Sequence, residues 1–221
     1  MTALTVLQLD TGFPRVPGDV GCAATYTGTV QVLRIPRATV AHVVTSNPDA
    51  IDIAPFEAAI ALAQGEVIAT SCGFLAPFQD RLAARTGRPV IASALGALDD
   101  LSLTHSPDQI LIITFDASIL GPAHLGRHAV FAQGIVGLPP DSHLRRVIVG
   151  DLTKLDTDRA GAEVVALVAR HRRPAHRHIL LECTNLPPYK AALRAATGLP
   201  VTDILSRIEA ARPGTVVPAF V

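Results

Sequence analysis

The chain lacks a net charge and a long apolar segment, and each absence argues against a class of protein. Its 221 residues carry 19 Lys and Arg against 19 Asp and Glu. This balance produces no overall field that would favour nucleic acid or an anionic membrane surface. The opening residues MTALTVLQLD contain neither a basic start nor a stretch long enough to cross a bilayer. We therefore expect a cytoplasmic protein, without export or membrane insertion.

Cysteine is also scarce, and its spacing argues against a redox or disulfide framework. The chain has 3 cysteines, at positions 22, 72 and 183, and no CxxC pair. In a reducing compartment such cysteines are expected to be free thiols. A thiol redox protein is therefore disfavoured, because no cysteine has a second cysteine close by in the sequence with which it could form a disulfide during turnover. With 49% hydrophobic and 17% charged residues, the chain can bury a large core.

An internal repeat is the strongest pattern in the sequence. CGFLAPFQDRLAARTGRPV begins at Cys72 and CTNLPPYKAALRAATGLPV begins at Cys183, a register of 183 − 72 = 111 residues. The copies match at nine of nineteen positions, among them both cysteines and the pair Gly87 and Gly198. A period near half the chain length predicts two similar half-domains. The two cysteines would then be equivalent across a pseudo-twofold axis.

Short apolar runs alternate with helical periodicity, which predicts an α/β fold with parallel sheets. The expected strands are 4–9, 67–70, 90–93, 110–114, 147–149 and 179–181. A helix with Pro55 in its first turn should end before Gly65, and a second should begin at 156–158. That second helix should bury Ala160, Val164, Leu167 and Val168. A proline-started helix should follow each cysteine and stop at Gly87 or Gly198.

These elements predict two pseudo-symmetric α/β half-domains with an active site in the cleft between them. We expect an N-terminal half at residues 1–100 and a C-terminal half at 101–221, with the segment near 200–221 able to pack back onto the first half. Residues 4–93 should superpose on residues 110–201, with Cys72 on Cys183. The basic run 171–178 lies where a helix should end, which suits the helix dipole better than an anion site.

Each repeated cysteine is expected at a strand end, just before a helix. There the helix N-terminus would stabilise a thiolate and lower the thiol pKa towards neutrality. Such a thiol could give or take a proton at pH 7. Burial as small apolar residues is the alternative for Cys72 and Cys183, but repetition in phase with the flanking motif favours function. Cys22 has no such partner and is assigned no role.

These motifs resemble the aspartate/glutamate racemase superfamily over essentially the whole chain. The resemblance is carried by TSCGF around Cys72, by ECTN around Cys183 and by LDTG at 9–12, where Asp10, Thr11 and Gly12 fit a DSG start. It implies two α/β halves with the site between them and no pyridoxal phosphate, metal or other cofactor. The segment LDTGFPRVPGDVG resembles a less well characterised branch more than glutamate racemase itself.

The resemblance implies a cofactor-independent racemase or epimerase that inverts a carbon next to a carboxylate or carbonyl. Cys72 and Cys183 would be two bases on opposite faces of that carbon, one removing a proton and the other delivering one. The substrate would be an amino acid, a hydantoin or a related small acid. The expected substrate-binding residues are Asp10, Thr11, Ser71, Gly73, Thr114, Asp116, Thr184 and Asn185. Asp10 has a turn or helix-cap role as its alternative, and Arg15 is left outside the core site.

Departures from glutamate racemase keep other activities open. Gly73 and Phe74 stand where an asparagine and a threonine follow the first cysteine, and Asn185 replaces a histidine that could titrate. A maleate isomerase-like or arylmalonate decarboxylase-like enzyme on the same scaffold is the alternative, as is a non-catalytic binding protein for small acids. The expected partner is a small-molecule carboxylate or carbonyl substrate, not nucleic acid or a membrane. A homodimer is left open.

Overall fold

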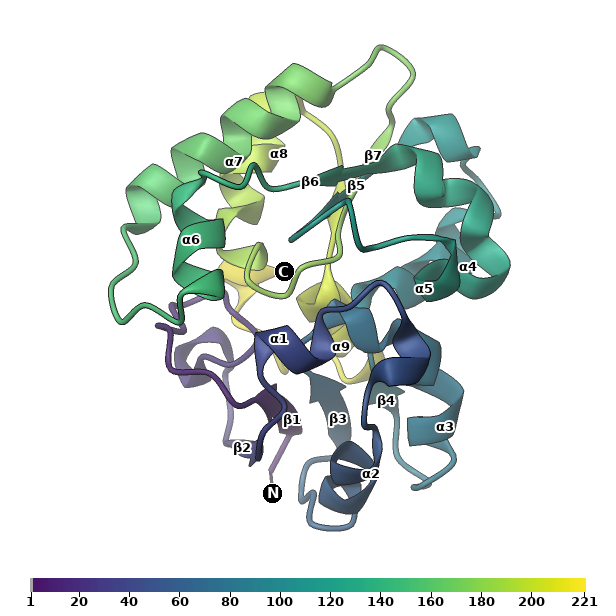
Figure 1. The fold of residues 1–221 in the computed structure, drawn as a ribbon, viewed down its shortest axis with the longest axis vertical. Helices are drawn as coiled ribbons and strands as arrows, with labels where there is room; N and C mark the ends of the chain where they lie inside the picture. Colours follow the sequence, from purple (N-terminus) through teal and green to yellow (C-terminus); the bar gives the residue numbers. More distant parts are fainter. Residues whose placement is uncertain (1) are drawn as a thin grey trace.

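The computed structural model describes residues 2–221 and contains two four-stranded sheets whose strands are all parallel (Figure 1). The first sheet has the order β2-β1-β3-β4, with β1 at Leu4–Leu9, β2 at Val30–Ile35, β3 at Val67–Thr70 and β4 at Val90–Ile91. The second has the order β6-β5-β7-β8, with β5 at Ile110–Thr114, β6 at Ile135–Gly137, β7 at His178–Leu181 and β8 at Val201–Thr202. The predicted α/β class with two parallel-sheet halves is confirmed.

The two sheets share one connectivity, and this makes the cysteines equivalent. In each sheet the third strand in chain order lies beside the first. Cys72 follows the end of β3 at Thr70 by two residues, and Cys183 follows the end of β7 at Leu181 by two residues. The repeat therefore marks the same place in both halves. Because the strands are parallel, each cysteine lies at the carboxyl edge of its sheet, where α/β proteins bind ligands.

Nine α-helices pack around the sheets of the described chain. In Figure 1 the half with β1 to β4 lies below with α2 and α3, and the half with β5 to β7 lies above with α6, α7 and α8. Their bounds are α1 Val40–Val43, α2 Ala54–Ile60, α3 Gln79–Ala83, α4 Leu98–Leu101, α5 Pro122–Leu125, α6 His143–Val149, α7 Thr157–His171, α8 Lys190–Thr197 and α9 Ile204–Ala211. Within residues 2–221, no helix combines the length and apolar character that crossing a bilayer requires.

Several local signals in the sequence lead to the expected elements. Asp156 caps α7, its side chain accepting a hydrogen bond from the backbone of Arg159, and the four predicted core residues of that helix are buried. Pro55 lies in the first turn of α2. Gly198 ends α8 with φ at +66°, in the left-handed region that glycine tolerates.

Other expectations are wrong, each for a local reason. Residues 147–149 belong to α6, because Leu144, Val147 and Ile148 form a buried stripe at helical spacing. The segment after Cys72 is a 3-10 helix over Gly73–Phe78 followed by α3, which ends four residues before Gly87. The prediction omits β2 and β6, which are edge strands and only half-buried, and the short β8. Edge strands lack the all-apolar pattern by which buried strands are recognised.

The C-terminal helix α9 packs on the first sheet, where the two halves meet. Ile204, Leu205 and Ile208 are buried in the same apolar cluster as β1 and β3. In Figure 1 the helix lies beside β3, between the two halves. The expected half-domain boundaries at 1–100 and 101–221 stay a prediction.

The fold leads to a prediction about the buried ion pair at the start of α9. The Lys190 Nζ and Asp203 Oδ2 atoms lie 2.9 Å apart, and their side chains are 3% and 0% exposed. Lys190→Met should lower the free energy of unfolding by about 3–5 kcal/mol, because it leaves a buried carboxylate without its cation. The control is Arg159→Met, which breaks an exposed pair with Glu163 at the same 2.9 Å and should cost at most about 1 kcal/mol. Urea unfolding measures both, and equal losses would contradict the prediction.

Candidate active site

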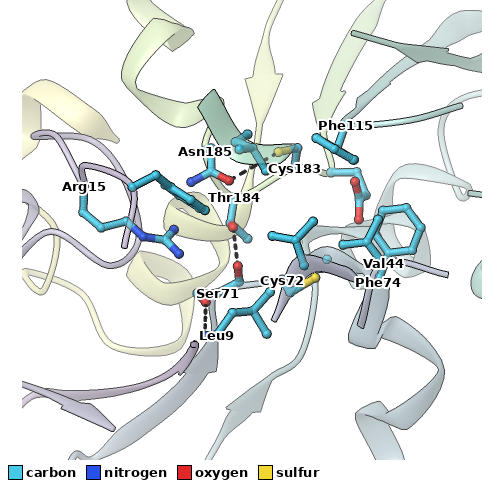
Figure 2. Close-up of a pocket in the computed structure, with 15 residues that line it drawn as sticks. Leu9, Arg15, Val44, Ser71, Cys72, Phe74, Phe115, Cys183, Thr184 and Asn185 are labelled. Atoms are coloured by element: carbon cyan, nitrogen blue, oxygen red, sulfur yellow. Dashed lines mark hydrogen bonds between the residues drawn. The ribbon is translucent and has the colours of Figure 1, made fainter. Parts of the chain in front are cut away.

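A cavity lies where the carboxyl ends of β3 and β7 face each other (Figure 2). Its apolar wall comes from strand ends and from the helices α1 and α6 that cover it. That wall consists of Leu9, Phe13, Val40, Val44, Phe74, Phe115 and Ile148. Its polar lining consists of Arg15, Ser71, Cys72, Gly73, Glu182, Cys183, Thr184 and Asn185. A mostly apolar cavity with a few convergent polar groups is typical of a small-molecule site.

Both repeated cysteines line this cavity as free thiols. Cys72 and Cys183 are each 6% exposed, and they enter from different halves of the molecule. Figure 2 shows Cys183 near Phe115 and Cys72 near Phe74 and Val44. The structure thus brings together the two residues that the repeat makes equivalent. Cys22 is also a free thiol but is absent from the cavity lining.

The expected lowering of the thiol pKa is wrong for both cysteines. Burial, and next to it the charge of Glu182, raises the pKa of Cys72 to about 12, although the Phe74 backbone and Arg15 act in the opposite direction. The same two causes raise the pKa of Cys183 well above its ordinary value. The helix N-terminus is outweighed because desolvation penalises a thiolate that has no water around it. Both residues are therefore neutral thiols near pH 7.

Two hydrogen bonds fix the loops that carry the thiols. The Thr184 hydroxyl donates to the Ser71 backbone oxygen at 2.7 Å, which joins the two loops across the cavity. The Ser71 hydroxyl in turn accepts a hydrogen bond from the Leu9 backbone at 2.9 Å. The Cys183 thiol points at the Asn185 Oδ1 atom, 3.8 Å away. Ser71, Thr184 and Asn185, three of the predicted binding residues, thus lie in the cavity and set its geometry.

A carboxylate that the sequence prediction does not include lines the cavity near both thiols. Glu182 is 1% exposed, and its Oε2 atom accepts a hydrogen bond of 2.6 Å from the Thr114 hydroxyl. Its Oε1 atom is buried and has no hydrogen-bond partner among the described residues. Burial raises the pKa of this carboxyl to about 7, although the Thr114 hydrogen bond lowers it. A carboxyl group with this pKa can gain or lose a proton near neutral pH.

Gly73 makes room for this carboxylate. A Cβ atom at position 73 would overlap the Glu182 Oε1 atom and would lie 2.5 Å from the Glu182 backbone oxygen. No side chain fits there, so the glycine that follows the first cysteine is explained by the carboxylate that precedes the second. The two cysteine motifs are therefore matched to each other across the cavity.

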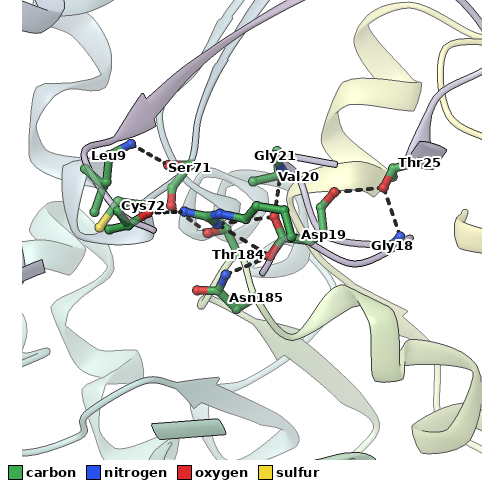
Figure 3. A network of polar contacts seen from close by, with 12 residues as sticks. Leu9, Gly18, Asp19, Val20, Gly21, Thr25, Ser71, Cys72, Thr184 and Asn185 are labelled. Atoms are coloured by element: carbon green, nitrogen blue, oxygen red, sulfur yellow. Dashed lines mark hydrogen bonds and ion pairs between the residues drawn. The ribbon is translucent and has the colours of Figure 1, made fainter. Parts of the chain in front are cut away.

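Arg15, a mostly buried side chain, lines another side of the cavity (Figure 2), next to a polar network around Asp19 and Asn185 (Figure 3). The Arg15 Nη1 atom lies 3.2 Å from the Asp19 Oδ1 atom, and the side chains are 10% and 3% exposed. Asp19 also accepts a hydrogen bond of 2.7 Å from Asn185 Nδ2. The Arg15 Nε atom is buried and has no partner among the described residues. This free N–H can donate to an anionic group in the cavity.

Four of the predicted substrate-binding residues do not line the cavity. Asp10 is partly exposed and pairs with Arg34 and the Arg37 backbone. Thr11 is buried and accepts a hydrogen bond from Arg15, which makes it a support for that residue. Thr114 contacts the cavity only through Glu182, and Asp116 pairs with Arg145. Each of the four lies near a strand end, as expected, but its side chain is hydrogen-bonded to or paired with another group of the protein.

Three charged residues that line or support the cavity are missing from the predicted set. Glu182 has a signal, because a carboxylate directly after the apolar strand 179–181 is unusual and must lie at the cavity edge. Arg15 and Asp19 lie in a loop rich in proline and glycine, and nothing in that loop separates them from solvated charges. Within residues 2–221, no three His, Cys, Asp or Glu side chains gather as a metal site.

Comparisons with known proteins give different relatives by sequence and by fold. No family model matches the chain. Dimethylsulfoniopropionate lyase from Durusdinium sp. clade D is 29% identical over 92% of this chain and 71% of the lyase. Dimethylsulfoniopropionate lyases 3 and 5 from Emiliania huxleyi are 31% and 30% identical, over 92% and 94% of this chain. The chain spans only 57% and 44% of the length of these two relatives.

Solved structures share the fold at low identity. Allantoin racemase from Pseudomonas fluorescens has a TM-score of 0.62 at 13% identity, covering 94% of this chain and 88% of its own. Arylmalonate decarboxylase has a TM-score of 0.58 at 15% identity, covering 98% and 96%. Glutamate racemase from Francisella tularensis has a TM-score of 0.52 at 11% identity, covering 95% and 78%. These likenesses confirm the two-halved racemase fold, and the sequence relatives carry the name of a lyase.

The fit between Gly73 and Glu182 predicts the effect of adding a methyl group. Gly73→Ala should lower the free energy of unfolding by about 1–3 kcal/mol or more, because both the carboxylate and a backbone oxygen must move. The control is Gly87→Ala in the same repeat copy, where a Cβ meets nothing within 4 Å and the change should stay within about 1 kcal/mol. Chemical unfolding at one pH tests the pair. Similar values for the two variants would show that position 73 is not tightly packed.

The raised pKa of Glu182 predicts a pH-dependent stability. Its stabilising contribution is fully present below about pH 4.5, where the unfolded chain is also protonated, and is lost as the pH rises to about 7. Glu182→Gln removes this titration, so the stability of the variant relative to the wild type should rise across that window, by on the order of 3 kcal/mol. The histidines are the same in both proteins and cancel in the difference. Urea unfolding between pH 4.5 and pH 7.5 measures it, and a flat difference would contradict the assignment.

Proposed function

We propose that this chain is a lyase that removes the proton next to a small carboxylate and expels a leaving group from the β carbon. Dimethylsulfoniopropionate is the first candidate substrate. The observation that carries the proposal is the pair of buried thiols in one cavity, with an arginine and a carboxylate beside them. The sequence relatives support a lyase, because they carry the name of one that acts on this compound.

Arg15 is the residue we propose for the substrate carboxylate. Its unpartnered Nε–H is a donor already stripped of water, and an oxygen of the substrate would satisfy it. The guanidinium is preorganised by Asp19 and Thr11, so binding costs little further ordering. As the α-proton leaves, negative charge spreads into the carboxylate, and a fixed cation stabilises that charge. Arg15 would thus serve both binding and the transition state.

A thiolate would remove the α-proton, and no outside reactant is needed. The C–H electron pair forms a double bond between the α and β carbons, and the bond from the β carbon to sulfur breaks with its pair on sulfur. Dimethylsulfoniopropionate would give acrylate and dimethyl sulfide, and the thiol would lose its proton to water to restore the base. A positive substrate group in the cavity favours the thiolate, because it offsets the charge of Glu182 that disfavours it.

A racemase or epimerase is the second candidate, and one observation favours it. Cys72 and Cys183 come from equivalent places in the two halves and line the same cavity. Such a pair suits a reaction in which one thiol removes a proton and the other returns one to the far face. Elimination needs only one thiol as base. The two candidates therefore make different demands on the second cysteine.

Serine variants of the cysteines separate these reactions. With dimethylsulfoniopropionate in deuterated water, headspace chromatography measures dimethyl sulfide, and NMR measures acrylate and deuterium at the α carbon. One of Cys72→Ser and Cys183→Ser should lose elimination by about a hundredfold or more, because a hydroxyl is a poor base, while the other keeps part of the activity. Cys22→Ser is the control and should match the wild type.

The same experiment can overturn the proposal. Absence of both product and α-deuterium with the wild type, on this compound and on a panel of small carboxylates with β leaving groups, contradicts a lyase. Inversion of chiral amino acids or hydantoins, lost completely in both serine variants, would establish the racemase instead.

A further inference from the structure

Glu182 is a buried carboxylate in the cavity that forms no ion pair with a cationic side chain of the described residues. No Lys or Arg in residues 2–221 pairs with Glu182, and burial and the Thr114 hydroxyl are the only causes of its pKa shift. The positive charge of Arg15 is engaged by Asp19. A carboxylate buried without a counter-ion is costly, so its retention in a ligand cavity points to a ligand that supplies the charge.

The residues that contact the Glu182 carboxylate are next in sequence to two phenylalanines of the cavity wall. Its contacts Gly73 and Thr114 are the chain neighbours of Phe74 and Phe115, and both rings line the cavity. Figure 2 shows Phe74 and Phe115 on the side of the cavity away from Arg15. The faces of aromatic rings attract methylated cations, which cannot be held by hydrogen bonds. The cavity lining therefore includes a cationic side chain, Arg15, and a carboxylate, Glu182, that has no cation of its own.

We propose that Glu182, set in the space left by Gly73 and flanked by Phe74 and Phe115, is the residue that selects substrates with a methylated onium group on the β carbon. This inference rests on the proposed function and names its substrate class, a small zwitterion with a carboxylate at one end and a fixed positive charge at the other. The cation would lie against the free Oε1 atom, the Phe74 ring and the face of the Phe115 ring that Arg145 does not cover. The elimination converts the positively charged onium group into a neutral leaving group. The site would therefore bind the substrate better than the neutral product.

The decisive experiment compares two ligands of one shape and different charge, and it needs no turnover. The first is β-alanine betaine, a propionate with a trimethylammonium group on the β carbon. The second is the carboxylate in which a tert-butyl group replaces the trimethylammonium group. Calorimetry should show that the wild type binds the betaine at least about tenfold more tightly. Equal affinities, or tighter binding of the neutral ligand, would overturn the proposal without any variant.

Glu182→Gln assigns the preference to this residue. In the variant the preference for the betaine should fall to about twofold or less, with binding of the neutral ligand kept or improved, because the amide has no charge to lose. The control is Glu66→Gln, which removes a surface carboxylate paired with Arg212 and should leave the preference as in the wild type. A preference that survives in Glu182→Gln would place the cation elsewhere.

Unmethylated β-alanine tests the aromatic part of the site. It should bind at least about tenfold more weakly than the betaine, because its ammonium group stays strongly hydrated and gains less from the rings. Tighter binding of β-alanine would overturn the selection of methylated cations. The outcomes are separable from those of the proposed function: selective binding without product contradicts only the lyase, and product formation without charge selection contradicts only this inference.

Discussion

The hydrogen bond from Thr184 to the Ser71 backbone oxygen joins the two cysteine loops, and the geometry of the cavity depends on it. At 2.7 Å it connects residues 113 positions apart in the sequence and lies at the carboxyl edges of both sheets. Parallel sheets bring strand ends to one edge, but nothing in a sheet aligns it with a second sheet. This contact, with the packing of α9 between the halves, holds Cys72 and Cys183 in one cavity.

Burial, and not the helix N-termini, determines which groups in this cavity are charged. The thiols are neutral because the apolar wall removes water and because Glu182 lies near both of them. The same burial leaves Glu182 able to gain or lose a proton near neutrality. The protonation of Cys72, Cys183 and Glu182 is therefore coupled, because each charge acts on the others in surroundings without water.

Much of the fold could be predicted from local pattern, and the errors have physical causes. The central strands β1, β3, β5 and β7 are buried along their whole length and mostly apolar, because helices or the other half cover both faces, and all four are predicted. The edge strands β2 and β6 are half-exposed and are missed. At the site, the repeat leads to Ser71, Cys72, Gly73, Cys183, Thr184 and Asn185, which all line the cavity. Asp10, Thr11, Thr114 and Asp116 do not, because loop partners that no pattern reveals take up their side chains.

The sequence by itself determined that the chain has two alike halves and that Cys72 and Cys183 are equivalent. A repeat copies local structure, so the same residues after the same strand form the same turn twice. Only the tertiary structure decided what those cysteines are chemically. Their pKa depends on residues from the opposite half and from α1 and α6, which exclude water, and on a carboxylate that approaches only because position 73 has no side chain. Electrostatics in a buried site is a property of the assembled surroundings, and those surroundings come together only when the two halves meet.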